Sequence, residues 1–131
     1  MVIVDTTVWI DYLRGIRNPE TQWLDRELPF RRFGLTDLIL CEALQGVNEG
    51  AHFATIRDEL LNFRVFEPAG IELAIAAAQN YQILRRHGFT VRKIVDCLIG
   101  TFCLRERYSL LHRDRDFDPF EEVLGLAVIH P

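Results

Sequence analysis

Apolar and polar residues along this chain form two kinds of segment. Short runs rich in β-branched and other apolar residues predict strands at 2–5, 33–35, 64–66, 109–112 and 126–129. Between them, apolar residues at helical spacing predict helices at about 7–15, 19–28, 38–44, 51–63, 70–87 and 92–107. This alternation is typical of an α/β fold, in which a parallel sheet is covered by helices on both faces through right-handed crossovers.

Residues that start and stop helices support these boundaries. Thr6 and Thr7 follow the first strand and are expected to cap the first helix, and Thr36 is expected to cap the third. Pro19 suits the first turn of the second helix, and Gly88 ends the long alanine-rich helix. Near the end of the chain, Asp118 precedes a proline and predicts a turn.

The length and composition indicate one globular domain over residues 1–131. The chain has 131 residues, of which 49% are hydrophobic, enough for one complete core. No apolar run is long enough to cross a bilayer, so no membrane association is expected. The amino terminus has neither the basic lead nor the apolar core of a secretory signal, which favours a cytoplasmic protein.

The cysteines and histidines do not predict a disulfide framework or a zinc site. Their spacing shows no paired metal-ligand pattern, and an odd number of cysteines argues against a set of disulfides. We expect the cysteines to be buried free thiols. The residues concerned are Cys41, Cys97 and Cys103, with His52, His87, His112 and His130.

Five acidic residues lie where charge is unexpected. Asp5 closes the first strand, Asp114 and Asp116 follow the fourth, and Glu42 and Asp96 lie within otherwise apolar helices. An acid at the carboxyl end of a buried parallel strand faces the crevice where open α/β sheets bind ligands. If these acids converge there, a divalent cation with its preference for oxygen ligands is the natural neutralising partner.

Most of these acids also have a structural explanation when taken singly. Asp5 is suited to a helix cap or a turn, and the helix dipole stabilises an acid such as Asp96 in a first turn. Asp114 and Asp116 are also compatible with a solvated charged loop, because Arg113 and Arg115 alternate with them.

Glu42 is the least easily explained of the five. Apolar residues surround it on its predicted helix, and a buried, unpaired glutamate is costly. It therefore calls for a cation, a proton or a hydrogen-bond donor. The alternative is an exposed stripe that continues to Gln45 and Glu49.

The charge balance is compatible with an anionic partner despite its sign. The formal net charge is −4, and the five acids account for all of it. Fourteen of the fifteen basic residues are arginine, whose planar fork suits phosphate, although genome composition explains the bias equally well. Candidate phosphate contacts, each with ordinary solvated surface as the alternative, are Arg85, Arg86, Arg113 and Arg115.

Four segments together resemble the PIN-domain ribonucleases and, more closely, the VapC toxins of toxin–antitoxin pairs. They are Val4–Asp11, Cys41–Gly46, Asp96–Ile99 and Leu110–Phe117, and the resemblance extends over essentially the whole chain. It implies a three-layer α/β/α sandwich with a central parallel sheet. It also implies an acidic quartet of Asp5, Glu42, Asp96 and Asp114, with Asp116 as a fifth acid and Thr7 hydrogen-bonded to a site carboxylate or water.

The activity implied by the resemblance is endonucleolytic cleavage of RNA that depends on Mg²⁺ or Mn²⁺. Asp5 and Asp96 are expected to anchor the ion, with Glu42, Asp114 and Asp116 around it. A metal-bound water would attack the phosphodiester, and Asp114 or Glu42 would take its proton. One departure from the family is the lead into Asp96, Val91–Val95, where small residues or proline are common.

The resemblance also implies two protein partners. A cognate VapB-type antitoxin is expected to lay a helix or tail over an apolar groove and to place a basic side chain among the acids, and the toxin is expected to form a homodimer. Trp9, Tyr12 and Trp23 on the first two helices are candidates for that groove, with simple core packing as the alternative, which is favoured for Trp9.

Two other functions compete with this interpretation. A phosphoaspartyl hydrolase would need a second aspartate where Thr7 stands, and a receiver domain would need a lysine after a late strand, whereas Lys93 precedes a helix. A catalytically idle PIN fold that binds RNA or a partner is the alternative from a different class, although a scaffold has no need for so many clustered carboxylates.

Overall fold

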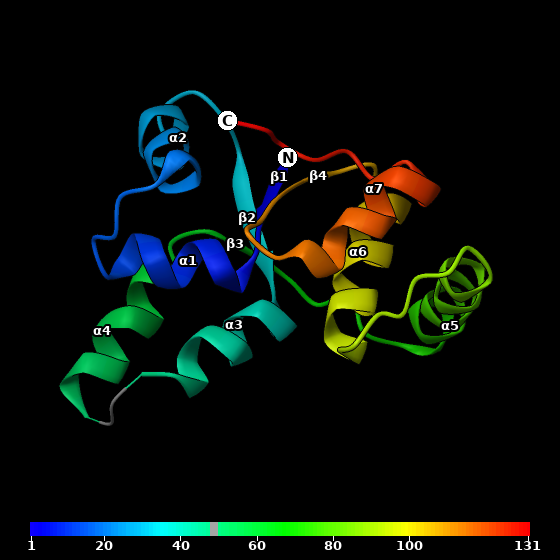
Figure 1. Cartoon of the computed structure of the whole chain (residues 1–131). Coiled ribbons are helices and arrows are strands. Elements are labelled where there is room, and N and C mark those ends of the chain that lie inside the picture. The colour runs from blue at the N-terminus through cyan, green and yellow to red at the C-terminus, as the bar shows by residue number, and fades with distance from the viewer. Residues whose placement is uncertain (48–49) are drawn as a thin grey trace.

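A four-stranded parallel sheet forms the centre of the computed structural model, which describes residues 1–47 and 50–131 (Figure 1). The strands lie in the order β3-β2-β1-β4. They are β1 (Val2–Val4), β2 (Phe33–Thr36), β3 (Arg64–Phe66) and β4 (Ser109–Leu111). Each neighbouring pair runs parallel, as the alternation of strands and helices predicted.

Helices cover both faces of the sheet. Figure 1 shows the first four on one side and the last three on the other, which makes the predicted three-layer sandwich. The helices are α1 (Thr6–Leu13), α2 (Pro19–Glu27), α3 (Asp37–Gln45), α4 (Ala51–Leu60), α5 (Ile71–Arg86), α6 (Ile94–Glu106) and α7 (Asp118–Leu124), with a 3₁₀ turn, η1 (Arg115–Phe117), before α7. Among the described residues, no helix combines the length and hydropathy that crossing a bilayer requires.

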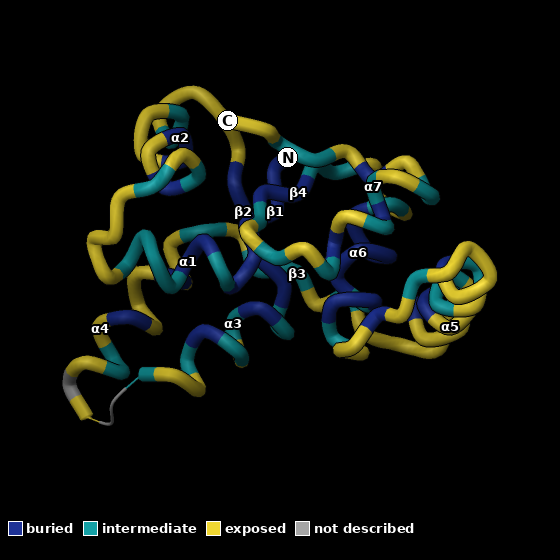
Figure 2. The backbone as a smooth tube through the Cα atoms, viewed as in Figure 1, coloured by how far each residue is buried: buried dark blue, intermediate teal, exposed yellow. Residues whose placement is uncertain are grey.

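The core lies where the helices pack on the sheet. Every residue of β1 and β2 is buried, as expected for parallel strands covered on both faces (Figure 2). Trp9 on α1 is fully buried and packs against Phe63, with ring centroids 4.8 Å apart. The core alternative for Trp9 is therefore confirmed. Trp23 is also buried, at 8% exposure.

The predicted cap of the first helix is wrong. Asp5, not Thr6 or Thr7, is the N-cap, because it keeps an extended backbone and its side chain accepts a hydrogen bond from the Thr7 N–H at 3.2 Å. The two threonines begin the helix instead. Thr36 does cap α3, as predicted, and accepts from the Ile39 N–H at 3.2 Å.

The carboxyl-terminal segment differs from the prediction. Residues 126–129 do not form a fifth strand, because only one bridge, Leu110 to Val128, joins them to β4. Asp118, predicted to lie in a turn, instead begins α7, with Pro119 in the first turn. Proline is favoured there because its missing N–H has no helical acceptor to lose.

One cysteine also departs from the prediction. Cys41 is exposed on α3, whereas Cys97 and Cys103 are buried as expected. The fully buried Ile39 and the buried Ala43 mark the face of α3 that packs inward, and Cys41 lies away from it.

A close contact joins α6 to the carboxyl-terminal segment. A Cβ atom on Gly100 would lie 2.7 Å from Cδ1 of Phe120, so only glycine admits the Phe120 ring at this distance. Phe120 is itself fully buried. The contact brings the helix that begins just before Asp96 against the segment that follows Asp114 and Asp116.

Candidate active site

Asp5 and Asp114 lie in the segments that leave the carboxyl edge of the sheet. β1 and β4 are neighbours, with Val4 opposite Leu111, so the residues after each strand leave the sheet side by side. Asp5 follows β1, and its N–H donates to the Leu111 carbonyl at 2.9 Å. Asp114 lies three residues after the end of β4. The edge where the sequence placed a crevice therefore carries acids from both ends of the chain.

Asp96, Asp114 and Asp116 form the tightest acidic group. One carboxylate oxygen from each lies within 4.8 Å of the others, a spacing suited to ligands of a single ion. Asp96 is only 3% exposed, and its Oδ2 is buried without a hydrogen-bond partner among the described residues. A buried carboxylate oxygen without a donor calls for a cation.

Asp5 and Glu42 lie outside this group but are oriented toward the same region by two threonines. The Thr7 hydroxyl donates to Asp5 Oδ2 at 2.7 Å, which confirms the hydrogen bond predicted between Thr7 and a site carboxylate. The Thr6 hydroxyl donates to Glu42 Oε1 at 3.0 Å. Glu42 is only half-buried, and Glu49, the end of its alternative exposed stripe, lies outside the described residues.

The electrostatics show that the acids act on one another. Burial first, and then the negative charges of Asp5 and Asp114, raise the pKa of Asp96 to about 7 against a lowering by Lys93. Burial is also the main cause that raises the pKa of Asp5 to about 6, with hydrogen bonds from Thr7 opposing it and the charge of Glu42 adding to it. Carboxylates whose charged forms are this unfavourable fit a divalent cation, which replaces the missing positive charge.

The segment that carries Asp114 and Asp116 is held by its own hydrogen bonds. Asp114 Oδ1 accepts from the Asp116 N–H at 2.9 Å, and the Asp114 N–H donates to His112 Nδ1 at 3.1 Å. His112 therefore accepts at Nδ1, and burial lowers its pKa, which favours the neutral ring. The sequence analysis missed this role, because His112 lies two residues before Asp114 and is not part of any metal-ligand spacing.

Arg113 belongs to a clamp rather than to a free phosphate site. Its Nη1 lies 2.9 Å from Asp11 Oδ2, and its Nε lies 3.4 Å from Glu20 Oε2. Its backbone N–H donates to the Thr7 hydroxyl oxygen at 3.1 Å. These contacts tie the loop after β4 to α1 and α2, so the charge of Arg113, predicted to bind phosphate, is already matched by two carboxylates.

The remaining candidate residues differ in their surroundings. Tyr12 is half-buried, and its hydroxyl donates to Asp25 at 3.3 Å. Arg115 is exposed on η1, and Arg85 and Arg86 are exposed at the end of α5. A cationic residue that the sequence analysis did not single out, Arg92, contacts Asp116, with its Nη2 3.3 Å from Oδ1.

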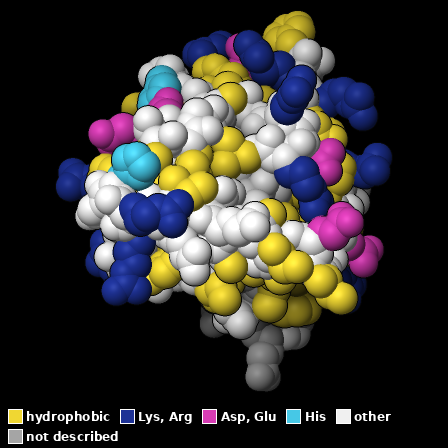
Figure 3. Space-filling view, turned by 90° about the vertical axis from the view of Figure 1, so that its right-hand side faces the viewer, with side chains coloured by type: hydrophobic (Ala, Val, Ile, Leu, Met, Phe, Trp, Pro, Cys, Tyr) yellow, Lys and Arg dark blue, Asp and Glu magenta, His cyan; other side chains and the backbone are white. Residues whose placement is uncertain are grey.

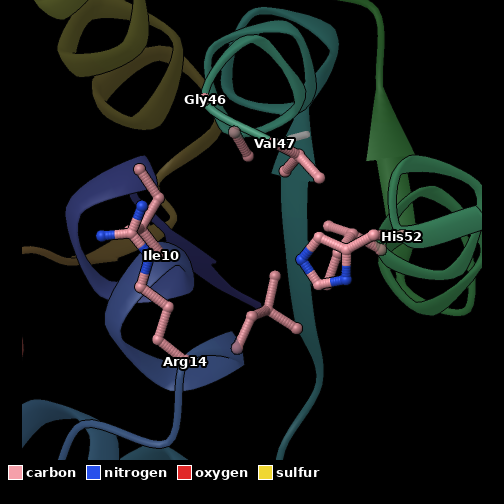
Figure 4. A pocket seen from close by; sticks show the side chains of 8 residues that line it. Ile10, Arg14, Gly46, Val47 and His52 are labelled. Atoms are coloured by element: carbon pink, nitrogen blue, oxygen red, sulfur yellow. The ribbon is translucent and has the colours of Figure 1, made fainter. Parts of the chain in front are cut away.

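Two grooves lie on opposite sides of the molecule. One, of about 640 Å³, runs between α5 and α6 and is lined by apolar residues with Arg85 and Arg92. Figure 3 faces the α5 side, where hydrophobic side chains lie among arginine and lysine side chains. The other, of about 300 Å³, lies between α1, α3 and α4 and is lined by Ile10, Leu13, Arg14, Ala43, Gly46, Val47, His52 and Ile56 (Figure 4).

Comparison with known proteins identifies relatives of the chain along most of its length. A family model described as the PIN domain matches residues 2–123. Ribonuclease VapC11 of Mycobacterium tuberculosis is 32% identical over 132 residues, with 96% of each chain covered. FitAcB from Neisseria gonorrhoeae has a similar structure, with a TM-score of 0.76, 20% identity and coverage of 100% of this chain and 98% of that one. A toxin–antitoxin complex from Klebsiella pneumoniae gives a TM-score of 0.74 at 17% identity, with coverage of 100% and 98%.

Replacing Asp96 by asparagine is expected to stabilise the protein in EDTA near neutral pH. Because the pKa of Asp96 is raised in the fold, the folded state binds its proton more tightly than the unfolded chain, and stability falls as the pH rises from 3.8 to about 7. At about 1.4 kcal/mol per pKa unit, the gain from the substitution is at most about 4 kcal/mol. Thermal denaturation of both proteins across this pH range measures it.

The stability difference should vanish at the acidic end of the range, where Asp96 is protonated in both states. Glu122→Gln, on the exposed surface of α7, is the matched control and should leave the melting temperature unchanged. A difference between wild type and Asp96→Asn that stays constant with pH would contradict the electrostatic explanation.

Proposed function

This chain belongs to the PIN-domain family, and we propose that it is an endoribonuclease that depends on a divalent metal ion and serves as the toxin of a VapBC pair. The observation that carries the proposal is the convergence of Asp96, Asp114 and Asp116, with an unpartnered oxygen on Asp96. Its relative from M. tuberculosis is a ribonuclease, which supports the same activity here. An idle binding scaffold is not favoured, since it has no need for carboxylates held in mutual repulsion.

Mg²⁺ or Mn²⁺ is the proposed cofactor. Asp96, Asp114 and Asp116 would hold it, with Asp5 and Glu42 beside them. When bound, a divalent ion supplies a water of lowered pKa and positive charge opposite the scissile phosphate. The donor set consists of carboxylate oxygens alone, which suits hard cations rather than zinc.

The other residues of the site orient these carboxylates. Thr7 donates to Asp5 and, through its oxygen, accepts from the backbone N–H of Arg113, so one hydroxyl connects Asp5 to the residue that precedes Asp114. Thr6 holds Glu42 by one oxygen and orients it as a proton acceptor. Asp114 is the alternative acceptor, positioned by the Asp116 N–H.

Asp5→Asn and Asp96→Asn are expected to abolish RNA cleavage while the fold survives. Each substitution keeps the shape of the side chain but removes a negative charge that the metal needs. The measurement is incubation of the purified protein with total RNA, with and without Mg²⁺ or Mn²⁺, followed by mapping of the cut ends. We expect a loss of about a hundredfold to a thousandfold, as for removal of a group that stabilises developing charge.

Glu122→Gln is the control in this experiment and should cleave as wild type does. Circular dichroism establishes that the asparagine variants are folded. Undiminished cleavage by either variant, or by wild type in excess chelator, would refute the metal-dependent mechanism.

We further propose that a cognate VapB-type antitoxin binds the groove between α1, α3 and α4. The groove is lined by apolar residues such as Ile10, Leu13 and Val47, as a helix-in-groove site requires. Two of its walls, α1 and α3, also carry Thr7 and Glu42, so a segment lying in the groove can extend to the acids. The toxin–antitoxin complex of similar fold from K. pneumoniae supports such a partner.

Ile10→Asp is expected to weaken antitoxin binding by at least about tenfold without loss of RNA cleavage. A buried charge facing an apolar helix has no partner and costs more than the lost contact alone. The affinity is measured by titration of the toxin with labelled antitoxin. Phe30→Asp, at an 80% exposed position after α2, is the matched control. Equal affinities for Ile10→Asp and wild type would show that the antitoxin does not bind in this groove.

A homodimer in the cytoplasm is the remaining part of the proposal. Ile71 and Ile75 lie one turn apart on α5 and are 81% and 55% exposed, which is unusual for isoleucine. We assign this face to the contact between two copies. Light scattering should give the mass of a dimer for wild type and of a monomer for Ile75→Asp, while a monomeric wild type would exclude the dimer.

A further inference from the structure

Arg92 lies at the edge of the acidic group without being fixed there. Its guanidinium Nη2 is 3.3 Å from Asp116 Oδ1, and its side chain is 79% exposed. In the part of the chain that the structure describes, no other arginine or lysine forms an ion pair with Asp96, Asp114 or Asp116. Arg92 is thus the arginine that, among the described residues, pairs with one of these three carboxylates.

The contact between Arg92 and Asp116 is weak. The guanidinium of Arg92 is exposed, so water competes with Asp116 for its charge and the pair adds little to stability. A metal ion bound by Asp116 attracts the same carboxylate and repels the guanidinium. Arg92 is therefore able to leave Asp116 and to bind another anion within reach of its long side chain.

The surroundings of Arg92 add positive charge on the same side of the acids. Lys93 follows it and lowers the pKa of Asp96, so its charge acts on the buried carboxylate. Arg85, on the last turn of α5, lines the same groove as Arg92. Arg92 and Lys93, with Arg85 from α5, thus place positive charge on one side of the acids.

We propose that Arg92 binds a backbone phosphate of the RNA substrate next to the acidic group. The proposal rests on the function proposed above and names the residue that positions its substrate. The planar guanidinium forms two parallel hydrogen bonds to phosphate oxygens, which a lysine ammonium cannot reproduce. Arg113 is not suited to this role, because Asp11 and Glu20 already hold it.

The test compares Arg92→Ala, Arg92→Lys and the control Arg32→Ala in cleavage of an RNA oligonucleotide that contains a mapped cut site. Arg32 is exposed and precedes β2, at the amino edge of the sheet. For Arg92→Ala we expect KM to rise by about tenfold, as for loss of a hydrogen bond to a charged group. The slope of log(kcat/KM) against log salt should fall in magnitude by about 1, the signature of one lost phosphate contact.

Arg92→Lys should recover part of the affinity and restore the salt slope, because it keeps the charge but loses the fork. The Kd for Mg²⁺, measured by calorimetry, should change little in Arg92→Ala, whereas Arg32→Ala should match wild type throughout. If Arg92 serves only to neutralise Asp116, its removal will tighten Mg²⁺ binding and leave KM and the salt slope unchanged. That result would overturn the proposal.

The wild-type protein separates this inference from the proposed function. Metal-dependent cleavage by wild type together with unchanged kinetics for Arg92→Ala overturns only the assignment of Arg92. An absence of cleavage by wild type overturns both.

Discussion

The mutual repulsion of buried carboxylates is the constraint on which this structure depends. Asp5 and Asp96 lie where burial and neighbouring negative charges raise their pKa, so the fold holds them together at a cost in stability. That cost is compensated by the rest of the molecule. Two parallel strands deliver acids from distant segments to one edge, threonines orient two of them, and the Gly100–Phe120 contact packs α6 against the segment after β4. A site preorganised in this way would need little rearrangement of its side chains to bind a cation.

The sequence predicted the acids and their meeting place because both follow from local patterns. An apolar run that ends in an acid marks the carboxyl end of a strand, and the parallel sheet then brings such ends to one edge. The predictions from the sequence failed where the conformation of a residue depends on tertiary contacts. Both Asp5 and Thr7 are suitable caps for α1, and Asp5 is the cap because its backbone is extended. Residues 126–129 have the composition of a strand but make only one bridge to β4, through Leu110 and Val128. Neither the Arg113 clamp nor the Arg92 contact has a sequence signal, because their partners are distant in the chain.

Two arginines beside the acids show why the net charge of the chain says little about what its surface is able to bind. The chain is acidic overall, yet the arginines near the acids differ in how many carboxylates surround them. Arg113 is matched by Asp11 and Glu20 and stabilises the loop that carries Asp114. Arg92 is exposed at the rim of the acids. Two residues of the same type, both close to the site, thus differ in what they are able to bind, and the difference lies in the carboxylates around each.

The hydrogen bond between Thr7 and Arg113 joins residues 106 positions apart in the sequence. Asp5 leaves the ribosome early, whereas Asp114 and Asp116 are added more than a hundred residues later. At about 5–20 residues per second, translation leaves roughly 5–20 s during which the nascent chain has Asp5 but lacks Asp114 and Asp116. The acidic group of Asp96, Asp114 and Asp116 therefore forms late in synthesis, only after its last two members have been added.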